Sequence, residues 1–477
     1  MKQYNLIKNT SFISTIFNEE KSISPFLRSF FEQDYLPEEI IIVDGGSKDK
    51  TLNILKDFFL NKLSENKNLI VFKEDSEKIK LLNIESGVTI IDIFYVKFNK
   101  QKENTDINSD IDININNIDS NNNYDDSSND INNVINNFKD DFRNNNQIKI
   151  KNDNKINKNV NENDSEVKLT IKILQKTNAK ISEGRNTAIK NAKNEIICVS
   201  DAGCVFDKNW TYEITKYLIS NVNIYKDENK LDNKETAKKN NNNISISLDN
   251  RLNLIKKNKN HDDLMLFGNY DVVGGFSKPI ALTYLEKILS ICIMPKLKEI
   301  NPQKFMPSSR NISFKKITWE KVGGYPENLD YGEDMRFNFN LKQNGYVIKF
   351  NPDAIIFWRM REDIVQIFKQ FFRYSKGDAK GKMYFYRHLI RFLSFAIFIV
   401  IFLISIFFNL WFLLIYIPLF CYYVYKPYSR INNEFKHHKN KITRFFLKIS
   451  ALFTTPFMLI YIDIAKMAGY IYGFIER

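Results

Sequence analysis

Two short clusters of chemically active side chains stand out in the second half of the chain. Glu333 and Asp334 are adjacent acids that follow a glycine, and Gln370, Arg373 and Tyr374 fall within one later segment. A carboxylate can take the proton of an attacking hydroxyl group, and an arginine can neutralise a departing phosphate. Together these residue types predict a transfer reaction with a phosphate-bearing leaving group.

The elements that must position these residues have the pattern of a parallel α/β sheet. An apolar strand is expected at Phe12–Phe17, a helix with one buried face at Ser22–Phe31, and a β-branched strand at Ile40–Val43. Further strands are expected at Leu169–Leu174, Ile196–Ser200 and Val272–Phe276. Because parallel α/β sheets bind ligands at the carboxyl ends of their strands, Asp44 falls at a candidate binding edge.

Composition restricts the classes of partner. The chain has 477 residues and a formal charge of +13, and Lys and Arg gather beside the apolar runs of its C-terminal quarter. No nucleic-acid-binding signature accompanies this charge, so it indicates an anionic membrane surface and no nucleic acid. The four cysteines lack paired metal-ligand spacing, and Met1–Thr10 lacks a signal-peptide core. We therefore expect the catalytic part to stay in the cytoplasm.

Two polar tracts interrupt the sheet pattern. Residues 101–166 are rich in Asn, Asp, Lys and Ser, and residues 226–263 are similar but less extreme. Such segments cannot bury enough apolar surface to offset their ordering entropy, so both are predicted to be insertions, the first disordered. The first tract could instead separate two domains. We favour insertions within a single domain of residues 1–385, because surface loops tolerate long insertions.

The region 389–477 changes to membrane character. Phe392–Phe408 carries no charge, Asn409 interrupts the apolar run, and Leu410–Tyr425 resumes it. Each half approaches the ~20 residues needed to span a bilayer, so residues 389–426 are predicted to form a membrane hairpin that turns near Asn409. One long tilted helix and a buried soluble hairpin are the alternatives.

Charge predicts the orientation of this hairpin. Lys and Arg residues flank it on both sides, which places both of its ends in the cytoplasm. The last segment, 445–475, is apolar but carries Asp463 and Lys466. It either crosses the membrane a third time or lies in the interface, and the interfacial arrangement is slightly favoured.

The order of these segments resembles a glycosyltransferase of family 2, a membrane-anchored member with the nucleotide-sugar-binding fold called GT-A. The matching segments are Phe12–Phe31, Ile40–Thr51, Ser182–Trp210 and Pro307–Lys382. They cover most of the chain outside the insertions and the membrane region. The resemblance implies an α/β domain with a mostly parallel sheet, followed by C-terminal membrane helices.

The resemblance also assigns residues to a nucleotide-sugar donor. Asp44 would bind the nucleotide base, with Asn18 and Glu19 lining the same pocket, and Arg185 in Gly184-Arg185-Asn186 would pair with the diphosphate. Alternatively, Asp44 caps a helix, Asn18 and Glu19 lie in a solvated turn, and Arg185 is a surface arginine.

Asp201 stands where the family has an Asp-x-Asp motif for a divalent metal. The second acidic position is Gly203 in this chain. Asp201 would bind Mg²⁺ or Mn²⁺ through water with another residue completing the site, or would contact the ribose. A divalent metal is therefore expected as a cofactor, although the departure from the motif counts against tight binding.

The remaining site residues follow from the same resemblance. Asp334 corresponds to the family's catalytic base and Glu333 to an orienting or acceptor-binding group, although an acidic helix N-terminus has the same pattern. Gln370, Arg373 and Tyr374 resemble a Gln-x-x-Arg-Trp element with Tyr in place of Trp. Arg373 would neutralise the diphosphate and Tyr374 would face the acceptor. The alternative is an amphipathic helix on the membrane. We expect Arg310 to border the acceptor site.

These expectations combine into a membrane-anchored, inverting glycosyltransferase. Its donor is a nucleotide-diphosphate sugar, and its acceptor is a lipid-linked or cell-envelope glycan at the cytoplasmic face, beside membrane lipids. Two alternatives remain: a processive polysaccharide synthase, and an inactive membrane scaffold that only binds nucleotide-sugar.

Overall fold

The computed structural model of the protein describes residues 5–62, 69–74, 87–98, 168–219, 270–436, 438 and 440–477. The two predicted insertions, 101–166 and 226–263, lie outside these residues. Their disorder and their insertion into a single domain therefore stay predictions.

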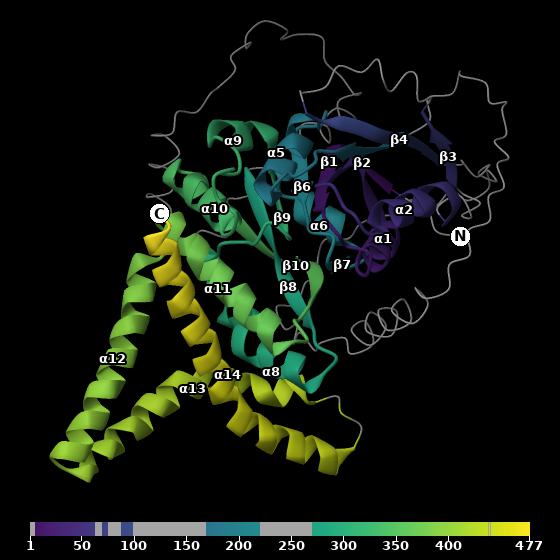
Figure 1. Cartoon of the computed structure of the whole chain (residues 1–477). Coiled ribbons are helices and arrows are strands. Elements are labelled where there is room, and N and C mark those ends of the chain that lie inside the picture. Colours follow the sequence, from purple (N-terminus) through teal and green to yellow (C-terminus); the bar gives the residue numbers. More distant parts are fainter. Residues whose placement is uncertain are drawn as a thin grey trace, which may run out of the picture.

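Within the described residues, ten strands form one sheet through the middle of the protein (Figure 1). Its strands lie in the order β3-β4-β5-β2-β1-β6-β9-β8-β10-β7. The strands are β1 (Asn5–Ile16), β2 (Tyr35–Asp44), β3 (Leu69–Lys73), β4 (Thr89–Phe98), β5 (Lys168–Gln175), β6 (Ile196–Val199), β7 (Cys204–Phe206), β8 (Val272–Ile280), β9 (Ile312–Lys315) and β10 (Ile348–Arg359).

The expected α/β class is confirmed, and the sheet is mixed. Pairing is parallel from β5 through β2 and β1 to β6, and again between β8 and β10. The remaining strand pairs are antiparallel, with β9 joining the two parallel groups. Because β1, β2 and β6 run in the same direction, the segments that follow Ile16, Asp44 and Val199 all leave the sheet at one edge.

Helices cover both faces of this sheet because successive strand residues point to opposite sides. Phe12 packs into an aromatic core with Phe26, Phe30 and Trp210, whereas the next residue, Ile13, packs into the opposite core. The helices on the Phe12 side are α1 (Ile23–Phe31), α2 (Thr51–Asp57) with the π-helix η1 (Phe58–Lys62), and α6 (Trp210–Thr215). Those on the Ile13 side are α5 (Ile181–Lys190), α9 (Lys316–Lys321) and α10 (Glu333–Gln343).

A third apolar cluster joins the sheet domain to the C-terminal helices. Its helices are α8 (Tyr284–Ile293), α11 (Ile364–Lys380), α13 (Tyr416–Glu434) and α14 (Lys441–Ile475). The remaining helical elements are the 3-10 helices η3 (Leu297–Glu299), η4 (Pro302–Lys304) and η5 (Leu410–Ile415), and the helix α12 (Phe385–Phe407).

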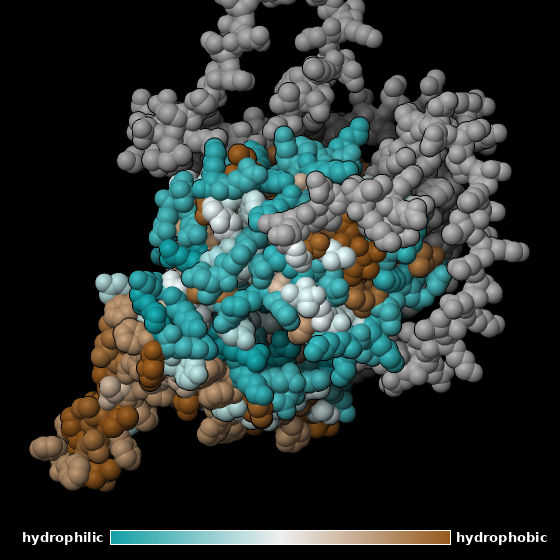
Figure 2. Space-filling model, turned by 45° about the horizontal axis from the view of Figure 1, so that its top comes forward, coloured by the Kyte–Doolittle hydropathy of each residue, from teal (hydrophilic) through white to brown (hydrophobic). Residues whose placement is uncertain are grey.

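The C-terminal helices have the length and composition of membrane spans. Among the described residues, three segments qualify: Phe385–Phe407, Leu410–Glu434 and Lys441–Ile475. The predicted break at Asn409 is confirmed, because α12 ends before this residue. The Asn409 side chain caps η5 by accepting a hydrogen bond from the Trp411 amide at 2.9 Å. The apolar arm of α12 and α13 projects from a mostly polar body (Figures 1 and 2).

The long helix α14 is fixed both to its membrane neighbours and to the body. The Asp463 carboxylate of α14 pairs with Arg391 of α12 at 2.8 Å and accepts a hydrogen bond from Tyr423 of α13 at 2.8 Å. Further along α14, a Cβ at Gly469 would lie 2.1 Å from the Phe372 carbonyl oxygen of α11. Only glycine permits this approach. The helix is thus long enough to cross a membrane and closely packed on α11 in its second half.

Candidate active site

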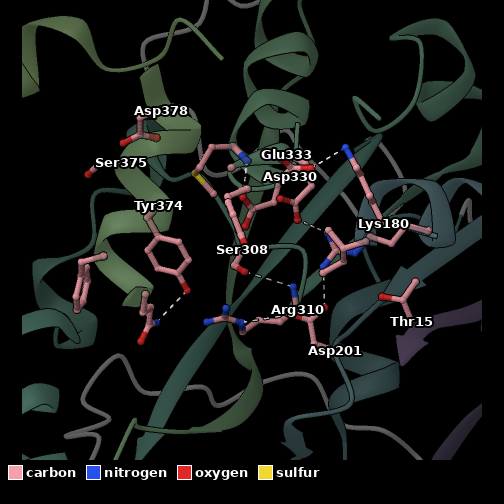
Figure 3. A pocket seen from close by; sticks show the side chains of 18 of the residues that line it. Thr15, Lys180, Asp201, Ser308, Arg310, Asp330, Glu333, Tyr374, Ser375 and Asp378 are labelled. Carbon is pink, nitrogen blue, oxygen red and sulfur yellow. Dashed lines mark hydrogen bonds and ion pairs between the residues drawn. The ribbon is translucent and has the colours of Figure 1, made fainter. Parts of the chain in front are cut away.

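A cavity of about 940 Å³ opens where the strand ends, α11 and the C-terminal helices meet. Figure 3 shows that labelled side chains from the two sides of this cavity, such as Asp201 and Tyr374, face a shared space. The polar face of the protein is hollowed at its centre in Figure 2. The cavity extends from the sheet edge at Thr15 and Gly45 to Lys466 on α14.

Arg185 lies at the sheet end of the cavity between two carboxylates. Its Nη2 atom is 2.7 Å from Asp201 Oδ1, and its Nη1 atom is 2.7 Å from Glu333 Oε1. The side chain is only 3% exposed, so these contacts are shielded from solvent. Burial by itself would lower the pKa of Arg185, but Asp201 and Glu333 raise it above its ordinary value. Arg185 therefore stays cationic.

Asp201 faces a second guanidinium group. Arg310 Nε is 3.8 Å from Asp201 Oδ2, and the Arg310 guanidinium lies 3.9 Å from the centre of the Trp358 ring. Burial would raise the pKa of Asp201, but Arg185 and Arg310 hold it below its ordinary value. The carboxylate is charged, and both of its oxygens face arginines.

This donor set does not fit a tightly held divalent metal. Among the described residues, no group of three or more His, Cys, Asp or Glu side chains is arranged to hold a metal ion. The second acidic position of the motif is Gly203, and the Asp201 oxygens are directed at cations. Mg²⁺ and Mn²⁺ need several oxygen ligands, which these residues do not provide.

The adjacent acids Glu333 and Asp334 have different environments at the start of α10. Glu333 is buried and bound to Arg185. Burial raises its pKa, Arg185 opposes the rise, and Asp334 adds to it. Asp334 is half-buried, lines the cavity and, within the described part of the chain, forms no ion pair. Its Oδ1 atom accepts a hydrogen bond from the Met335 amide at 2.7 Å. Of the two acids, Asp334 is therefore the one available to accept a proton.

Asp44 lies beneath the turn that follows β2. It is fully buried, and its carboxylate accepts hydrogen bonds from the Gly46 amide and from Gln175 Nε2, both at 2.9 Å, and from the Ser47 amide at 3.1 Å. The cavity is lined by the neighbouring Gly45, not by Asp44. In this structure Asp44 shapes the turn that borders the cavity.

Asn18 and Glu19 follow β1 but have different positions. Asn18 has a left-handed backbone (φ 55°), and its side chain accepts a hydrogen bond from the Lys48 amide at 2.9 Å, outside the cavity lining. Glu19 lines the cavity. Burial raises the pKa of Glu19, a hydrogen bond from Ser22 lowers it, and Asp201 raises it, with a net rise. The structure thus brings Glu19 to the cavity and uses Asn18 in the turn.

Helix α11 presents Gln370 and Tyr374 to the cavity. Gln370 Nε2 donates a hydrogen bond to the Tyr374 hydroxyl at 3.0 Å, and Gln370 Oε1 is buried with no hydrogen-bond partner in the part of the chain that the structure describes. Arg373 lies on a neighbouring face of the helix, where it is exposed and stacks 5.5 Å from the centre of the Tyr331 ring. It does not line the cavity.

The structure therefore brings together most of the residues expected from the sequence. Those lining the cavity are Glu19, Arg185, Asp201, Arg310, Glu333, Asp334, Gln370 and Tyr374. Asn18, Asp44 and Arg373 lie outside its lining. Trp358, which supports Arg310, was not anticipated from the sequence. The cavity-lining residues of the C-terminal helices were not anticipated either, because the charges in this region were interpreted only as signals of membrane topology. They are Arg387, His388, Arg391 and Lys466.

Two family models match the sequence. The model described as Glycosyl transferase family 2 matches residues 11–84, which begin in β1. The model described as Glycosyl transferase family group 2 matches residues 283–426, which run from the start of α8 into α13. The matches thus include both the first part of the sheet and the segment that carries Glu333, Asp334 and Gln370.

A curated relative matches a short part of the chain. It is the dolichyl N-acetyl-alpha-D-glucosaminyl phosphate 3-beta-D-2,3-diacetamido-2,3-dideoxy-beta-D-glucuronosyltransferase of Methanococcus voltae, 42% identical over 73 residues. The match covers 14% of this chain and 22% of that protein, or about a fifth of its length.

Two solved structures show a distant overall likeness. The mannosyltransferase PcManGT from Pyrobaculum calidifontis, in complex with GDP-Man and Mn²⁺, has a TM-score of 0.43 and 10% identity, covering 98% of this chain and 88% of that one. S. aureus TarS 1–349 has a TM-score of 0.32 and 13% identity, covering 98% and 90%.

Proposed function

This chain is a family 2 glycosyltransferase, and we propose that it transfers a sugar from a nucleotide-diphosphate-sugar donor to a lipid-linked or cell-envelope glycan, with inversion at the anomeric carbon. The observation that carries the proposal is the placement of Asp334. Its carboxylate faces the cavity without an ion pair in the described residues, while the adjacent Glu333 is held by Arg185. A protein that only bound nucleotide-sugar would have no need of a base in this position.

In the proposed reaction, a hydroxyl oxygen of the acceptor forms a bond to the anomeric carbon of the donor sugar. The bond from that carbon to the diphosphate oxygen breaks, and its electron pair leaves with the nucleoside diphosphate. The hydroxyl proton passes to Asp334. General-base catalysis of this kind contributes about 100- to 10,000-fold to the rate.

Arg310 is the residue we assign to the departing diphosphate, with Arg185 beside it. Arg310 lines the cavity, rests on Trp358 and is only loosely paired with Asp201 at 3.8 Å, so it can bind an incoming anion. Fixed positive charge of this kind stabilises a leaving group without reorganisation. Because the donor set around Asp201 does not fit a metal, we assign no step to one. Arg373 is exposed and outside the cavity lining, so its position does not support the expected role of neutralising the diphosphate.

The acceptor side is formed by α11. Gln370 Oε1 is a buried acceptor without a partner in the described structure, and Tyr374 adds an aromatic surface beside it. Buried polar atoms are normally hydrogen-bonded, so an acceptor hydroxyl group would satisfy Gln370. The apolar arm of α12 and α13 would anchor the protein, and the basic residues on both sides of that arm support a catalytic domain on the cytoplasmic face.

Release of nucleoside diphosphate tests this function. Membranes containing the wild-type protein, Asp334→Asn or the exposed control Asp353→Asn would be supplied with a panel of nucleotide-sugars. We expect donor-specific release that Asp334→Asn lowers about 100- to 10,000-fold, because the base is lost, while donor binding is kept. Asp353→Asn should match the wild type.

Two results would contradict the proposal. Full activity in Asp334→Asn would exclude Asp334 as the base. Saturable donor binding without release, in the presence of native lipids, would support the scaffold alternative. The length of the product would distinguish transfer of one sugar from processive synthesis.

A further inference from the structure

The cavity does not end at Asp334 but continues to the membrane helices. Arg387, His388 and Arg391 of α12 and Lys466 of α14 line it at this end. Both helices are long and apolar enough to cross a membrane. One cavity therefore connects the residues assigned to the donor with side chains at the edge of the membrane region.

Arg391 and His388 at this membrane end form a paired network. Arg391 pairs with Asp463 at 2.8 Å and lies 3.1 Å from His388 Nδ1. The other ring nitrogen of His388 is 2.9 Å from Asp378, and the ring stacks on Tyr470. The acids of this region are thus already engaged by Arg391 and His388.

Lys466 and Arg387 have no such partner. Within the described residues neither forms an ion pair, although Lys466 Nζ lies 5.0 Å from the centre of the Phe371 ring and Arg387 lies 5.4 Å from that of Tyr384. Asp463, Arg391, Arg387 and Asp378 are all close enough for their charges to act on Lys466, although Asp463 and Asp378 are paired with Arg391 and His388. Lys466 is partly buried beside Phe371, where an unpaired charge is costly, whereas Arg387 is exposed at the same end, so this end of the cavity is suited to an anion.

The surroundings of these cations are apolar as well as basic. Ile293 and Met294, at the end of α8, line the cavity together with Phe371 of α11. A ligand that satisfies this end therefore needs both a negative group and an apolar chain. A lipid that carries a phosphate has both.

We propose that Lys466 and Arg387 bind the phosphate group of a lipid phosphate, whose apolar chain lies toward the membrane helices. This inference rests on the proposed function in one respect, since it identifies the acceptor as a glycan carried on such a lipid. The phosphate is held at the membrane end, and the glycan extends toward Gln370 and Asp334. The cavity then selects its acceptor by the phosphate as well as by the sugar.

Binding of a defined lipid tests the site without requiring activity. The full-length protein would be placed in phosphatidylcholine nanodiscs and titrated with farnesyl phosphate. We expect Lys466→Met to weaken the binding of farnesyl phosphate about tenfold, as for loss of one charge-assisted hydrogen bond. Arg387→Gln, at an exposed position, should weaken it by about the same factor. Lys466→Arg should retain most of the affinity. Lys448→Met, on the same helix outside the cavity, should bind as the wild type does, and nucleotide-sugar binding should be equal in all variants.

Three probes distinguish the source of the phosphate. Farnesol tests the apolar chain alone, inorganic phosphate tests the free ion, and phosphatidylglycerol tests an ordinary bilayer headgroup. The inference requires that farnesyl phosphate bind better than all three. It is overturned if any of them binds equally well, or if both Lys466→Met and Arg387→Gln bind farnesyl phosphate as the wild type does.

The proposed function fails separately. Binding that depends on Lys466, together with no sugar transfer from any donor, would keep the lipid-phosphate site and reject the transferase. Transfer that depends on Asp334 but not on Lys466 would keep the transferase and reject the site.

Discussion

The two ends of the cavity hold positive charge in opposite ways. At the sheet end, Arg185 lies between Asp201 and Glu333, with both contacts at 2.7 Å and almost no exposure. At the membrane end, Lys466 and Arg387 line the same cavity without an ion pair in the described residues. A cation that is fully paired holds the fold together, whereas one left unpaired is available to a ligand. Removing each should therefore have a different effect.

The largest expected effect is on stability at the sheet end. Arg185→Met leaves Asp201 and Glu333 without their shared cation, and breaking a buried ion pair on one side costs about 3–5 kcal/mol. Denaturant unfolding of the protein in nanodiscs would measure this loss. Arg373→Met, which removes an exposed arginine, is the control and should change the free energy of unfolding by less than about 0.5 kcal/mol. Equal effects of the two variants would show that Arg185 stabilises the fold no more than an exposed arginine does.

The pH dependence of stability sharpens the same contrast. The folded pKa of Asp201 is lowered, so its contribution is present above its unfolded pKa and is lost as pH falls through the folded value. Asp201→Asn should therefore cost about 2 kcal/mol near neutral pH and progressively less in acid. Thermal unfolding of both proteins from about pH 7 to about pH 3 would show the two curves converging. A constant difference across this range would exclude the ion pair as its cause.

Restoring the second acid of the Asp-x-Asp motif tests whether its loss explains why the described residues at the sheet end do not fit a metal ion. A Cβ at Gly203 would meet nothing within 4 Å, so Gly203→Asp adds a carboxylate without steric conflict. We expect its affinity for Mn²⁺ to rise on the order of tenfold over a weak wild-type value, because affinity follows the number of charged oxygen ligands. Calorimetric titration would measure this, with Gly203→Asn as the uncharged control. Tight Mn²⁺ binding by the wild type would show that other residues complete the site.

The smallest expected effect is at the membrane end. Without a ligand, Lys466→Met removes an unpaired cation from apolar surroundings and should raise the free energy of unfolding by about 1 kcal/mol. Farnesyl phosphate should stabilise the wild type more than this variant, since a ligand stabilises the state that binds it. Unfolding with and without the lipid would measure both quantities. A marked destabilisation by Lys466→Met in the absence of lipid would show that Lys466 is structural.

Local sequence patterns predicted the elements better than the roles of their side chains. The apolar run of β1, the apolar face of α1 and the break at Asn409 all depend on neighbours a few residues apart, and the structure contains them. Asp44 was expected in the pocket because it ends a strand. Its carboxylate instead accepts hydrogen bonds from Gly46, Ser47 and the distant Gln175. No spacing in the sequence indicates the last of these partners.

The same limit applies within single segments. The motif containing Gln370, Arg373 and Tyr374 was recognised as a unit, but only Gln370 and Tyr374, one helical turn apart, face the cavity. Which face of α11 does so depends on its packing against α14, where Gly469 approaches the Phe372 carbonyl. Arg373 is on another face for that reason.

By itself, the sequence determined the α/β class, the apolar arm and the residue types needed for transfer, because periodicity, composition and turn residues act over short distances. Only the tertiary structure decided which of two adjacent acids is free and which cations are paired. In the sequence, Arg185 is separated from Glu333 by 148 positions, and Lys466 lies much further along the chain than either. Contacts between residues so distant in the chain arise from the packing of whole elements, and that packing gives each charge its partner or leaves it without one.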